Sequence, residues 1–221
     1  MSYSNLQIFI AELIGTFILV VFATGSIVYD IQTGGTLGIA FAAITPFIAL
    51  IIGIYSFGKI SLASFNPAVT IGFYITGHIS KIQIAYYFAA EIIGALFGSL
   101  FVMSFIGTGA NLGANTPNHD FSLFLIFSIE VLASALLMAV IFIVVYTKGL
   151  KGFGGIAIGG IVGLDIFFLA FISGASMNPA RALAPALFSG ALDNLWLYWT
   201  APYVGTIITA FLFRNKFHKR K

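Results

Sequence analysis

The sequence of 221 residues contains no cysteine and very few charged residues. The absence of cysteine excludes disulfide bonds, thiol chemistry and metal sites with thiolate ligands. Only 8% of the residues are charged, whereas 60% are hydrophobic, and the mean hydropathy is +1.06. A soluble domain of this size does not carry such a composition, so the sequence predicts an integral membrane protein.

Patterns that would indicate catalysis or a bound cofactor are missing as well. The sequence contains no glycine-rich phosphate-binding loop, no catalytic triad and no pair of neighbouring catalytic carboxylates. Its three histidines, His78, His119 and His218, are too far apart in the sequence to suggest a metal site. We therefore expect a protein that is not an enzyme and that holds no cofactor and no metal.

The sequence does contain six long apolar stretches, each close to the ~20 residues that an α-helix needs to cross a bilayer. The first stretch lacks a basic N-terminal region and is longer than the apolar part of a signal peptide, so we expect a retained helix. Little sequence is left for a soluble domain, and we expect a single membrane channel domain over residues 1–221. The six stretches cover residues 6–28, 36–57, 82–106, 121–147, 153–172 and 195–213.

The distribution of charge predicts the orientation of these helices, because Lys and Arg accumulate in cytoplasmic loops. If the chain crosses the bilayer six times, its basic residues fall on one side and its loop acids on the other. We therefore expect a multi-pass protein of the plasma membrane with both termini in the cytoplasm. A basic tail can also bind nucleic acid or anionic lipid, but we interpret it as an orientation signal and expect no nucleic-acid partner. The basic residues are Lys59, Lys81, Lys148, Lys151, Arg214, Lys216, Lys219, Arg220 and Lys221, and the acids are Asp30, Asp120 and Asp193.

The most informative motif is a tripeptide that occurs once in each half of the chain, as Asn66-Pro67-Ala68 and as Asn178-Pro179-Ala180. Asn is a favourable N-cap, and Pro suits the first helical position because the N–H that it lacks has no helical partner there. Each tripeptide therefore predicts the start of a helix, and neither following stretch is long enough to span a bilayer. Short helices at corresponding places of two halves are typical of inverted repeats around a site at the membrane midplane.

A lone glutamate precedes each tripeptide and supports the repeat. Glu12 lies 54 residues before Asn66, and Glu130 lies 48 residues before Asn178. Three spans in each half require the second half to enter the membrane upside down, so the two short helices meet from opposite faces. We expect both glutamates to be buried structural acids that accept backbone N–H groups of the irregular segments before the tripeptides. The expected divisions are a first repeat at residues 1–106, an exposed connector at 107–120, a second repeat at 121–213 and a basic tail at 214–221.

Three segments together resemble the aquaporin and aquaglyceroporin family of major intrinsic proteins. They are Ala11-Glu12 with Gly15-Thr16, then Asn66-Pro67-Ala68-Val69-Thr70, and then Ser173-Gly174-Ala175-Ser176-Met177-Asn178-Pro179-Ala180-Arg181. The resemblance covers the whole chain. It implies an all-α membrane fold with six transmembrane helices, two re-entrant half-helices and two inverted repeats. It also implies a pore in every subunit of a homotetramer in the lipid bilayer.

The resemblance further implies a selectivity filter on the extracellular side of the pore. Water-selective members of the family have an aromatic residue and a His opposite an Arg, whereas this sequence has Ile166 at the His position and the small Ala175. An apolar wall that faces one guanidinium predicts a wider opening that suits glycerol, urea or ammonia as well as water. The implied filter residues are Arg181, Ile166, Ala175 and Pro46, with Phe41 or Phe47 as alternatives to Pro46.

The physics of two converging half-helices predicts exclusion of ions independently of the resemblance. Each helix N-terminus carries a partial positive charge, so two of them in one place disfavour any cation, including a proton carried along a chain of water molecules. The side-chain amides of Asn66 and Asn178 can both donate to one water oxygen, whose hydrogens must then point outward in both directions. A role of these residues as helix caps alone, worth about 1 kcal/mol each, is the simpler interpretation, and we expect both roles.

Two further acids and a cluster of aromatic residues belong to predicted helices. Glu91 stands where the family commonly has Gln, and neither it nor Asp165 has a partner that the sequence identifies. Either acid could relay a proton or be a paired or protonated buried group. The other pattern is Trp196, Tyr198 and Trp199 at the start of the last span, which predicts an aromatic belt at the membrane interface.

We therefore predict a passive channel for water and small uncharged solutes that excludes protons and ions. A proton-coupled secondary transporter is an alternative, because such proteins share inverted repeats and broken helices, and Glu91 or Asp165 could carry the proton. A structural membrane tetramer with a closed pore is the other alternative.

Overall fold

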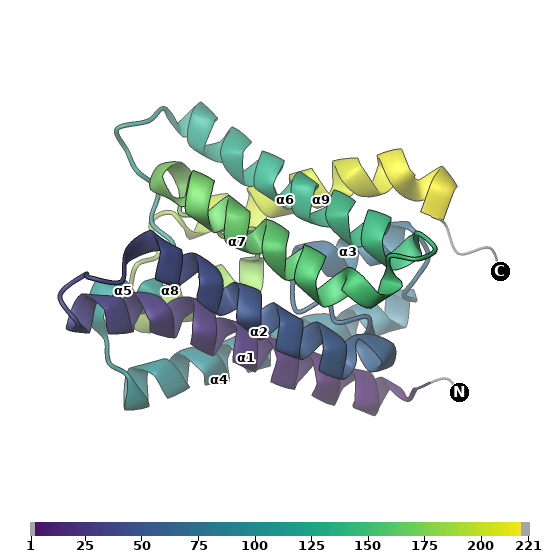
Figure 1. The fold of residues 1–221 in the computed structure, drawn as a ribbon, viewed down its shortest axis with the longest axis horizontal. Coiled ribbons are helices and arrows are strands. Elements are labelled where there is room, and N and C mark those ends of the chain that lie inside the picture. Colours follow the sequence, from purple (N-terminus) through teal and green to yellow (C-terminus); the bar gives the residue numbers. More distant parts are fainter. Residues whose placement is uncertain (1–2, 218–221) are drawn as a thin grey trace.

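In the computed structural model, which describes residues 3–217, the chain is built of helices and connecting loops, and these residues form no strand (Figure 1). Six of the helices are long and apolar enough to cross a membrane. The predicted basic and histidine residues at 218–221 lie outside the described part of the chain. The six long helices are α1 (Asn5–Gln32), α2 (Gly38–Ser61), α4 (Lys81–Phe105), α6 (Leu123–Tyr146), α7 (Gly154–Ser173) and α9 (Leu195–Phe217).

Polar caps set the start of long helices more sharply than the apolar stretches do. Before α1, the Ser4 hydroxyl accepts from the N–H of Gln7, and the Gln7 side chain accepts from the N–H of Ser4. Ser80 and Gln83 repeat this capping box before α4. Because a capping box satisfies two N–H groups that have no partner within the helix, it fixes the first turn. The predicted stretches therefore agree with the observed helices in position but differ by a few residues at their ends.

Two short helices, α3 (Pro67–Ile75) and α8 (Pro179–Ser189), begin directly after the asparagines of the two tripeptides. They have 9 and 11 residues, which at ~1.5 Å per residue is too short to cross a bilayer. In Figure 1, α3 lies toward the end of the molecule that carries both termini, and α8 lies toward the opposite end. Together with the six long helices they confirm the predicted fold. The connecting segments add a single left-handed turn, α5 (Gly109–Gly113), whose three inner residues have positive φ angles, and a 3₁₀ turn, η1 (Lys151–Phe153).

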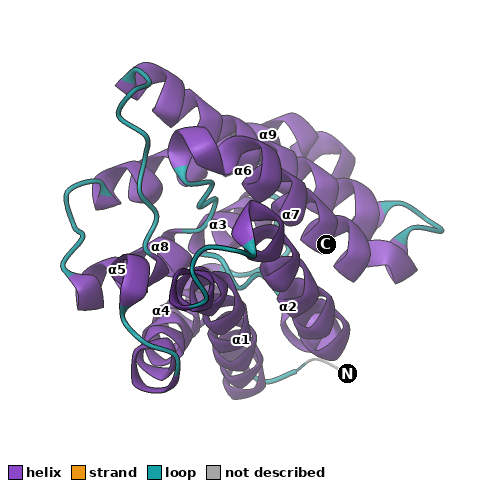
Figure 2. Cartoon of the chain, turned by 60° about the vertical axis from the view of Figure 1, so that its left-hand side comes forward, coloured by secondary structure: helices purple, strands orange, loops and turns teal. Residues whose placement is uncertain are grey.

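The long helices pack in matching pairs, with α1 against α4, α6 against α9, and α2 against α7. Figure 2 shows α3 and α8 between the group of α1, α2 and α4 and the group of α6, α7 and α9. Glycine allows two of the pairs to approach closely. A Cβ atom on Gly94 of α4 would lie 2.4 Å from the carbonyl oxygen of Leu13, and one on Gly205 of α9 would lie 2.3 Å from that of Val131. The two halves therefore use the same close crossing.

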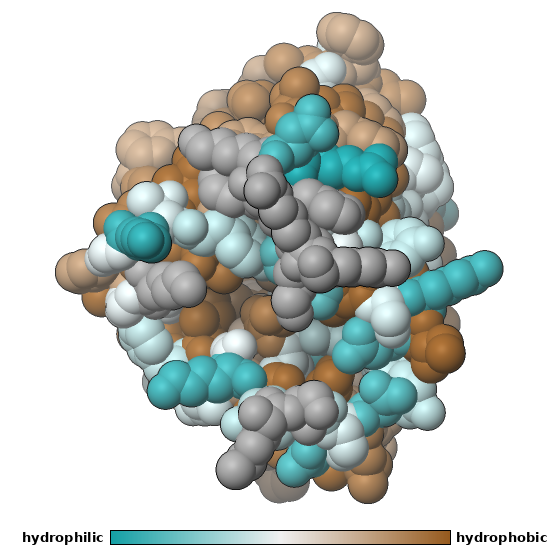
Figure 3. Space-filling view, turned by 90° about the vertical axis from the view of Figure 1, so that its right-hand side faces the viewer, coloured by the Kyte–Doolittle hydropathy of each residue, from teal (hydrophilic) through white to brown (hydrophobic). Residues whose placement is uncertain are grey.

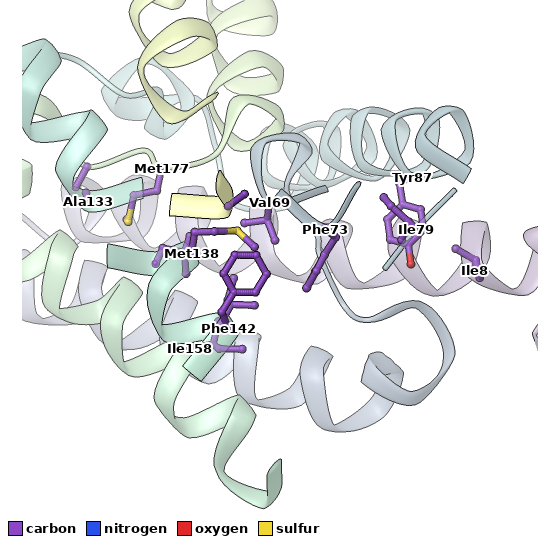
Figure 4. Close-up of a cluster of buried hydrophobic side chains, with 14 residues drawn as sticks. Ile8, Val69, Phe73, Ile79, Tyr87, Ala133, Met138, Phe142, Ile158 and Met177 are labelled. Carbon is purple, nitrogen blue, oxygen red and sulfur yellow. The ribbon is translucent and has the colours of Figure 1, made fainter. Parts of the chain in front are cut away.

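The largest apolar cluster fixes the first half-helix against the second half of the chain. Val69 and Phe73 of α3 lie beside Met138 and Phe142 of α6, and Met177 joins them from the segment before α8 (Figure 4). The rings of Phe73 and Phe142 meet edge to face with centroids 6.3 Å apart, a favourable aromatic geometry. A helix of 9 residues has little stability of its own, so this packing, together with contacts to α4 and α9, holds α3 in place.

The two ends of the molecule differ in charge. Both termini lie at one end (Figure 1), and hydrophilic side chains gather on the face seen in Figure 3, which looks onto that end. Lys59 in the last turn of α2 and Lys81 in the first turn of α4 belong to this end. Asp30, near the end of α1, belongs to the opposite end. The alternation of charge that the sequence predicts is therefore present in the fold.

Two expectations from the sequence are wrong in detail. The connector at residues 107–120 is not simply exposed, because Leu112 is 1% exposed and Asn115 is 9% exposed. The connector instead folds over the molecule, and Asn118 donates its backbone N–H to the carbonyl of Ile172. Tyr198 is not part of an interfacial belt, since it is 1% exposed inside the protein. Its neighbour Trp196 does lie at the surface.

Candidate functional site

Asn66 and Asn178 cap the two half-helices and also join the two halves of the chain. The Oδ1 atom of each accepts N–H groups from the first turn of its own half-helix, at 2.9–3.3 Å. The Nδ2 atom of Asn66 donates to the carbonyl of Met177, and that of Asn178 donates to the carbonyl of Phe65, both at 2.8 Å. Since a side-chain amide has two N–H groups, each Asn keeps a second one for the cavity that both residues line.

The segments that lead into the tripeptides, residues 62–65 and 174–177, are irregular and have matching backbone conformations. In each segment the first, second and fourth residues have positive φ angles, from 43° to 86°. A positive φ is uncommon for residues other than glycine and persists only where the surroundings hold it. The residues with positive φ are Leu62, Ala63 and Phe65 in the first segment, and Gly174, Ala175 and Met177 in the second.

Glu12 and Glu130 hold these two segments from behind. The carboxylate of Glu12 accepts the backbone N–H groups of Ser64 and Phe65, at 3.0 and 2.7 Å. The carboxylate of Glu130 accepts those of Ser176 and Met177, at 2.9 and 3.0 Å. Both acids are fully buried. The bonds satisfy N–H groups that have no helical partner and would otherwise be buried unpaired.

A pair of tyrosines completes the support of each segment. Tyr87 of α4 donates its hydroxyl hydrogen to the carbonyl of Ser61 at the end of α2. Tyr198 of α9 donates to the carbonyl of Ser173 at the end of α7, at 2.6 Å. Both bonds satisfy a carbonyl in a last helical turn, where the helix itself supplies no donor. The role of these tyrosines is therefore to fix where each long helix ends and each irregular segment begins.

A narrow cavity of about 50 Å³ passes between the two tripeptides. Because a water molecule needs about 10–15 Å³ of such space, the cavity has room for only a few waters in a row. Most of its wall is apolar and comes from α1, α2, α6 and α7. The polar side chains in the wall are Ser64, Asn66, Ser176, Asn178 and Arg181.

A wider cavity of about 270 Å³ opens toward the end of the molecule opposite the termini. Four residues line both cavities and therefore mark the neck between them: Ala23, Ile166, Ala175 and Arg181. The structure thus brings together three of the four residues that the sequence suggested for the filter. Pro46 lines the narrow cavity only, whereas Phe41 and Phe47 line neither cavity.

Arg181 is held at the neck by the connector. It is 8% exposed, and its guanidinium donates to the side-chain oxygen of Asn115. The amide nitrogen of Asn115 in turn donates to the carbonyl of Gly174, at 2.8 Å. Asn115 therefore ties the charged side chain to the irregular segment that forms the opposite part of the neck. A guanidinium fixed in this way presents its remaining N–H donors in a constant direction.

Behind the first tripeptide lies a polar network that the second half does not repeat. Thr70 lies 2.7 Å from both the hydroxyl of Ser64 and the Oε1 atom of Glu91, and the N–H of Asn66 donates to the same Oε1 at 3.1 Å. At the corresponding position of the second half-helix, four residues after its Asn, stands Ala182. Tyr87 corresponds to Tyr198, and Gly94 corresponds to Gly205. In the same alignment of the two halves, the residue that corresponds to Glu91 is Pro202. The first half therefore has an acid and a hydroxyl where the second has two apolar residues.

Asp165 remains apart from both cavities. It is 4% exposed, and its Oδ2 atom has no hydrogen-bond partner among the described residues. His78 lies near the end that carries the termini, where its Nδ1 atom is 2.8 Å from the Thr76 hydroxyl and its ring centroid lies 4.4 Å from that of Tyr146, with the two rings tilted by 36°. No group of three or more His, Cys, Asp or Glu residues within 3–217 could hold a metal ion.

The sequence did not reveal three of the residues that shape the site. Ala23 of α1 carries no signal, because a small apolar residue in an apolar helix is indistinguishable from its neighbours. Asn115 lies in a polar loop, where one Asn among several gave no indication of its contact with Arg181. Thr70 is part of the first motif, but its contact with Glu91 depends on how α3 packs against α4.

Comparisons with known proteins identify relatives of this chain. The family model for the major intrinsic proteins matches residues 1–213. Aquaporin AqpM of Methanothermobacter marburgensis is 37% identical and the alignment covers 92% of each chain. The glycerol uptake facilitator protein-like 6 of Lactiplantibacillus plantarum is 35% identical over 93% of this chain and 96% of that protein. The X-ray structure of the aquaglyceroporin from Plasmodium falciparum superimposes with a TM-score of 0.80 over 96% of both chains, at 25% identity.

Proposed function

The chain belongs to the major intrinsic protein family, and we propose from this membership and from the geometry of the two cavities which residues form its conducting path. The protein is a passive, multi-pass membrane channel for water and small solutes such as glycerol. We propose that solutes pass in single file between Asn66 and Asn178. The observation that carries this assignment is that both side chains line the same narrow cavity.

We propose that the selectivity filter is the neck formed by Ala23, Ile166, Ala175 and Arg181. Three of these side chains are apolar or small, and the fourth is a fixed guanidinium. A guanidinium only donates hydrogen bonds, so a neutral solute can accept hydrogen bonds from Arg181 through the oxygen atoms of its hydroxyl or amide groups. The carbon side of the same solute then contacts Ile166. Pro46 is then a wall residue further into the pore, on the narrow side of the neck.

Ion exclusion follows from the same residues. The N-termini of α3 and α8 both point into the narrow cavity with partial positive charge, and Arg181 adds a full charge at the neck. A cation that leaves bulk water for this cavity meets two helix N-termini and a guanidinium, and no acidic side chain of residues 3–217 lines the cavity to offset them. The spare amide N–H groups of Asn66 and Asn178 can orient a central water so that it does not pass a proton along the file.

Glycerol is a suitable solute because of the composition of the neck. With Ile166 in place of a polar ring, the wall opposite Arg181 offers no hydrogen bond, which suits the carbon backbone of a small polyol. The relative from Lactiplantibacillus plantarum is named as a glycerol uptake facilitator, and this supports the proposal. Urea and ammonia are uncharged and small enough to be further candidates.

We propose that the protein is a homotetramer of the plasma membrane with both termini in the cytoplasm. Both termini lie at the end that carries Lys59 and Lys81, which agrees with the preference of Lys for cytoplasmic loops. In α2 and α7 only 28% of the apolar stretch is buried inside the molecule, against 39–44% in the other long helices. These two helices therefore offer the most surface for contact with other subunits.

The repeat boundaries are also part of the proposal, with residues 1–106 and 121–213 as the two inverted repeats, 107–120 as the connector and 214–221 as a basic tail. The matched contacts of Glu12 and Glu130 support this division. Family membership favours the channel over a proton-coupled transporter and over a closed structural tetramer.

Light scattering from proteoliposomes in a stopped-flow instrument tests the proposed path and filter. Vesicles that contain the protein should shrink rapidly under an impermeant osmolyte, and they should re-swell rapidly when the osmolyte is glycerol or urea. Ile166→His narrows the neck and adds a polar ring, so it should lower glycerol permeability by about tenfold or more while water still passes. Ile166→Val, which keeps the wall apolar, is the matched control and should keep the glycerol flux.

The outcomes separate the parts of the proposal. Rapid shrinkage without re-swelling would mean that the neck admits water but not glycerol, and it would remove Ile166 and Ala175 as the cause of a broad selectivity. Equal glycerol permeability in Ile166→His and Ile166→Val would place the filter elsewhere in the pore. A lack of any protein-dependent water flux would contradict the conducting path itself.

A further inference from the structure

The hydrogen bonds behind the first tripeptide require one more hydrogen atom than the hydroxyl groups there can supply. Ser64 Oγ lies 2.9 Å from the carbonyl oxygen of Asn66 and 2.7 Å from Thr70 Oγ1, which lies 2.7 Å from Glu91 Oε1. These are three contacts between oxygen atoms, and each needs its own hydrogen. Ser64 and Thr70 bring one hydroxyl hydrogen each, and a carbonyl brings none. If each contact is a separate hydrogen bond, the third hydrogen comes from the carboxyl group of Glu91.

The second half of the chain indicates which way the hydroxyl of Ser64 points. Ser176 takes the place of Ser64 there, and its hydroxyl donates to the carbonyl of Asn178 at 3.1 Å. Ala182 stands where the first half has Thr70, so no side chain on that position competes for this hydrogen. If Ser64 donates to Asn66 in the same way, Thr70 must donate to Ser64. The contact between Thr70 and Glu91 can then be made only by a hydrogen on Glu91.

The surroundings of the three buried glutamates agree with this assignment. Glu12 and Glu130 each use both carboxylate oxygens to accept N–H groups, as an ionised carboxylate does. In Glu91 only Oε1 makes contacts, with Thr70 and with the backbone N–H of Asn66, and Oε2 is buried without a partner among the described residues. A protonated carboxyl group keeps some capacity to accept on the oxygen that carries its hydrogen. An oxygen that shares a full negative charge is far more costly to bury unpaired than the carbonyl oxygen of a neutral acid.

We propose that Glu91 is a protonated carboxylic acid in the working channel, that it donates to Thr70, and that through Thr70 and Ser64 it positions the pore wall at the first tripeptide. Ser64 lines the narrow cavity, whereas Thr70 and Glu91 are fully buried behind it. The three groups thus form one directed row of hydrogen bonds from Glu91 to the carbonyl of Asn66. Glu91 acts as a positioning residue, because it reaches the pore only through Thr70 and Ser64.

The other ionisable groups around Glu91 belong to its own helix and to the helices packed near it. Glu12 of α1 and Tyr203 of α9 lie close enough for their charge state to affect it, and so does Tyr87 of its own helix. On α3 the only titratable residue is Tyr74, which is exposed, and on α8 it is Arg181, which binds Asn115. A proton on Glu91 therefore avoids a second negative charge beside Glu12. It also keeps a negative charge away from the start of α3, where that charge would offset the barrier to cations.

Infrared difference spectroscopy on the full chain in lipid vesicles tests this assignment directly. At neutral pH the spectrum of the wild type minus that of Glu91→Gln should contain the C=O band of a protonated carboxylic acid, and this band should be lost at alkaline pH. Thr70→Val removes the partner of the acid hydrogen, so it should shift the band. Ser99→Ala is the matched control, because Ser99 is buried in the same helix and has no hydrogen-bond partner within residues 3–217. This variant should leave the band unchanged.

Flux measurements add a readout that a purely structural role would not give. As the pH is raised, the wild type should gain a cation leak over the range in which its acid band disappears. Glu91→Gln cannot ionise, so it should show no such pH-dependent leak.

Several results would overturn the assignment. Carboxylate bands in place of the acid band at neutral pH would show that Glu91 is ionised, and an unchanged band in Thr70→Val would show that Thr70 is not its partner. Should Glu91→Gln fail to assemble, the Thr70→Val comparison and the pH titration of the wild type decide the question by themselves. The flux part rests on the proposed function, but the infrared part does not, so a protein without water flux could still confirm or contradict the proton on Glu91.

Discussion

Glu12 and Glu130 perform the same task in the two halves of the chain, whereas the residues that follow Asn66 and Asn178 perform different ones. Each glutamate holds an irregular segment by two backbone N–H groups, and a tyrosine fixes the helix end before that segment. Three residues after the Asn, however, the first half has Val69 and the second has Arg181. The backbone support is duplicated and the side chains toward the solute are not.

This difference indicates which parts of the repeat are under geometric constraint. The unpaired N–H groups of a non-helical segment inside a membrane need partners wherever the segment occurs, so both halves must supply a buried acceptor. The pore wall has no such requirement, and a single charged side chain is enough to define a neck. The two halves can therefore diverge at Val69 and Arg181, and at Thr70 and Ala182, without loss of the fold.

The largest expected effect comes from removing either supporting acid. Glu12→Leu and Glu130→Leu each leave two buried N–H groups without an acceptor, at about 1–3 kcal/mol each, so the free energy of unfolding should fall by about 2–6 kcal/mol. Thermal unfolding of the purified protein in detergent, followed by size-exclusion chromatography, measures the loss. Ser99→Ala is the control. A large loss in one variant and none in the other would break the equivalence of the two acids.

The close helix crossings should respond next most strongly. Gly94→Ala and Gly205→Ala place a methyl group against a backbone carbonyl, and overpacking of this kind costs about 1–3 kcal/mol. The same unfolding assay should give similar losses for both variants. A methyl group on Gly160 would meet no atom of the described residues within 4 Å beyond its own helix backbone, so Gly160→Ala should leave stability unchanged or slightly higher. Tolerance of Ala at Gly94 alone would show that α1 and α4 can separate where α6 and α9 cannot.

Arg181→Val makes the second half like the first at the position where they differ. The neck loses its charge and widens, so glycerol permeability should rise about tenfold, which corresponds to about 1.4 kcal/mol of barrier. Stopped-flow re-swelling of proteoliposomes measures this change. Asn115→Ala removes the partner of Arg181 and the hydrogen bond to Gly174 but keeps the guanidinium, so it should change permeability in the same direction by less. An unchanged glycerol flux in Arg181→Val would mean that the asymmetry between the halves does not control selectivity.

The smallest expected effect concerns the two tyrosines. Tyr87→Phe and Tyr198→Phe each remove one hydrogen bond to a carbonyl at the end of a long helix, which should cost about 0.5–1.5 kcal/mol. Thermal unfolding of the two variants side by side tests whether the loss is equal. If Tyr87→Phe were clearly more damaging, the network around Glu91 would depend on Tyr87 in a way that has no counterpart at Tyr198.

The sequence by itself determined the membrane class, the six spans and the start of both half-helices. Apolar composition and length dictate a spanning helix whatever surrounds it, and Asn followed by Pro favours a helix start through local backbone geometry alone. The matching roles of Glu12 and Glu130 could also be inferred from the sequence, because a buried acid needs hydrogen-bond donors. Arg181 stood out because a charge in an apolar stretch has to serve a purpose.

Only the tertiary structure decided which side chains meet. Asn115 reaches Arg181 because the connector folds back over the neck, and Tyr198 turns inward because α9 packs against α6 and the end of α7 lies beside it. The contact of Glu91 with Thr70 depends on the angle at which α3 rests on α4, which no local pattern encodes. In a chain that is apolar almost throughout, periodicity identifies helices but not their facing surfaces. Those surfaces are set by packing between segments that lie far apart in the sequence.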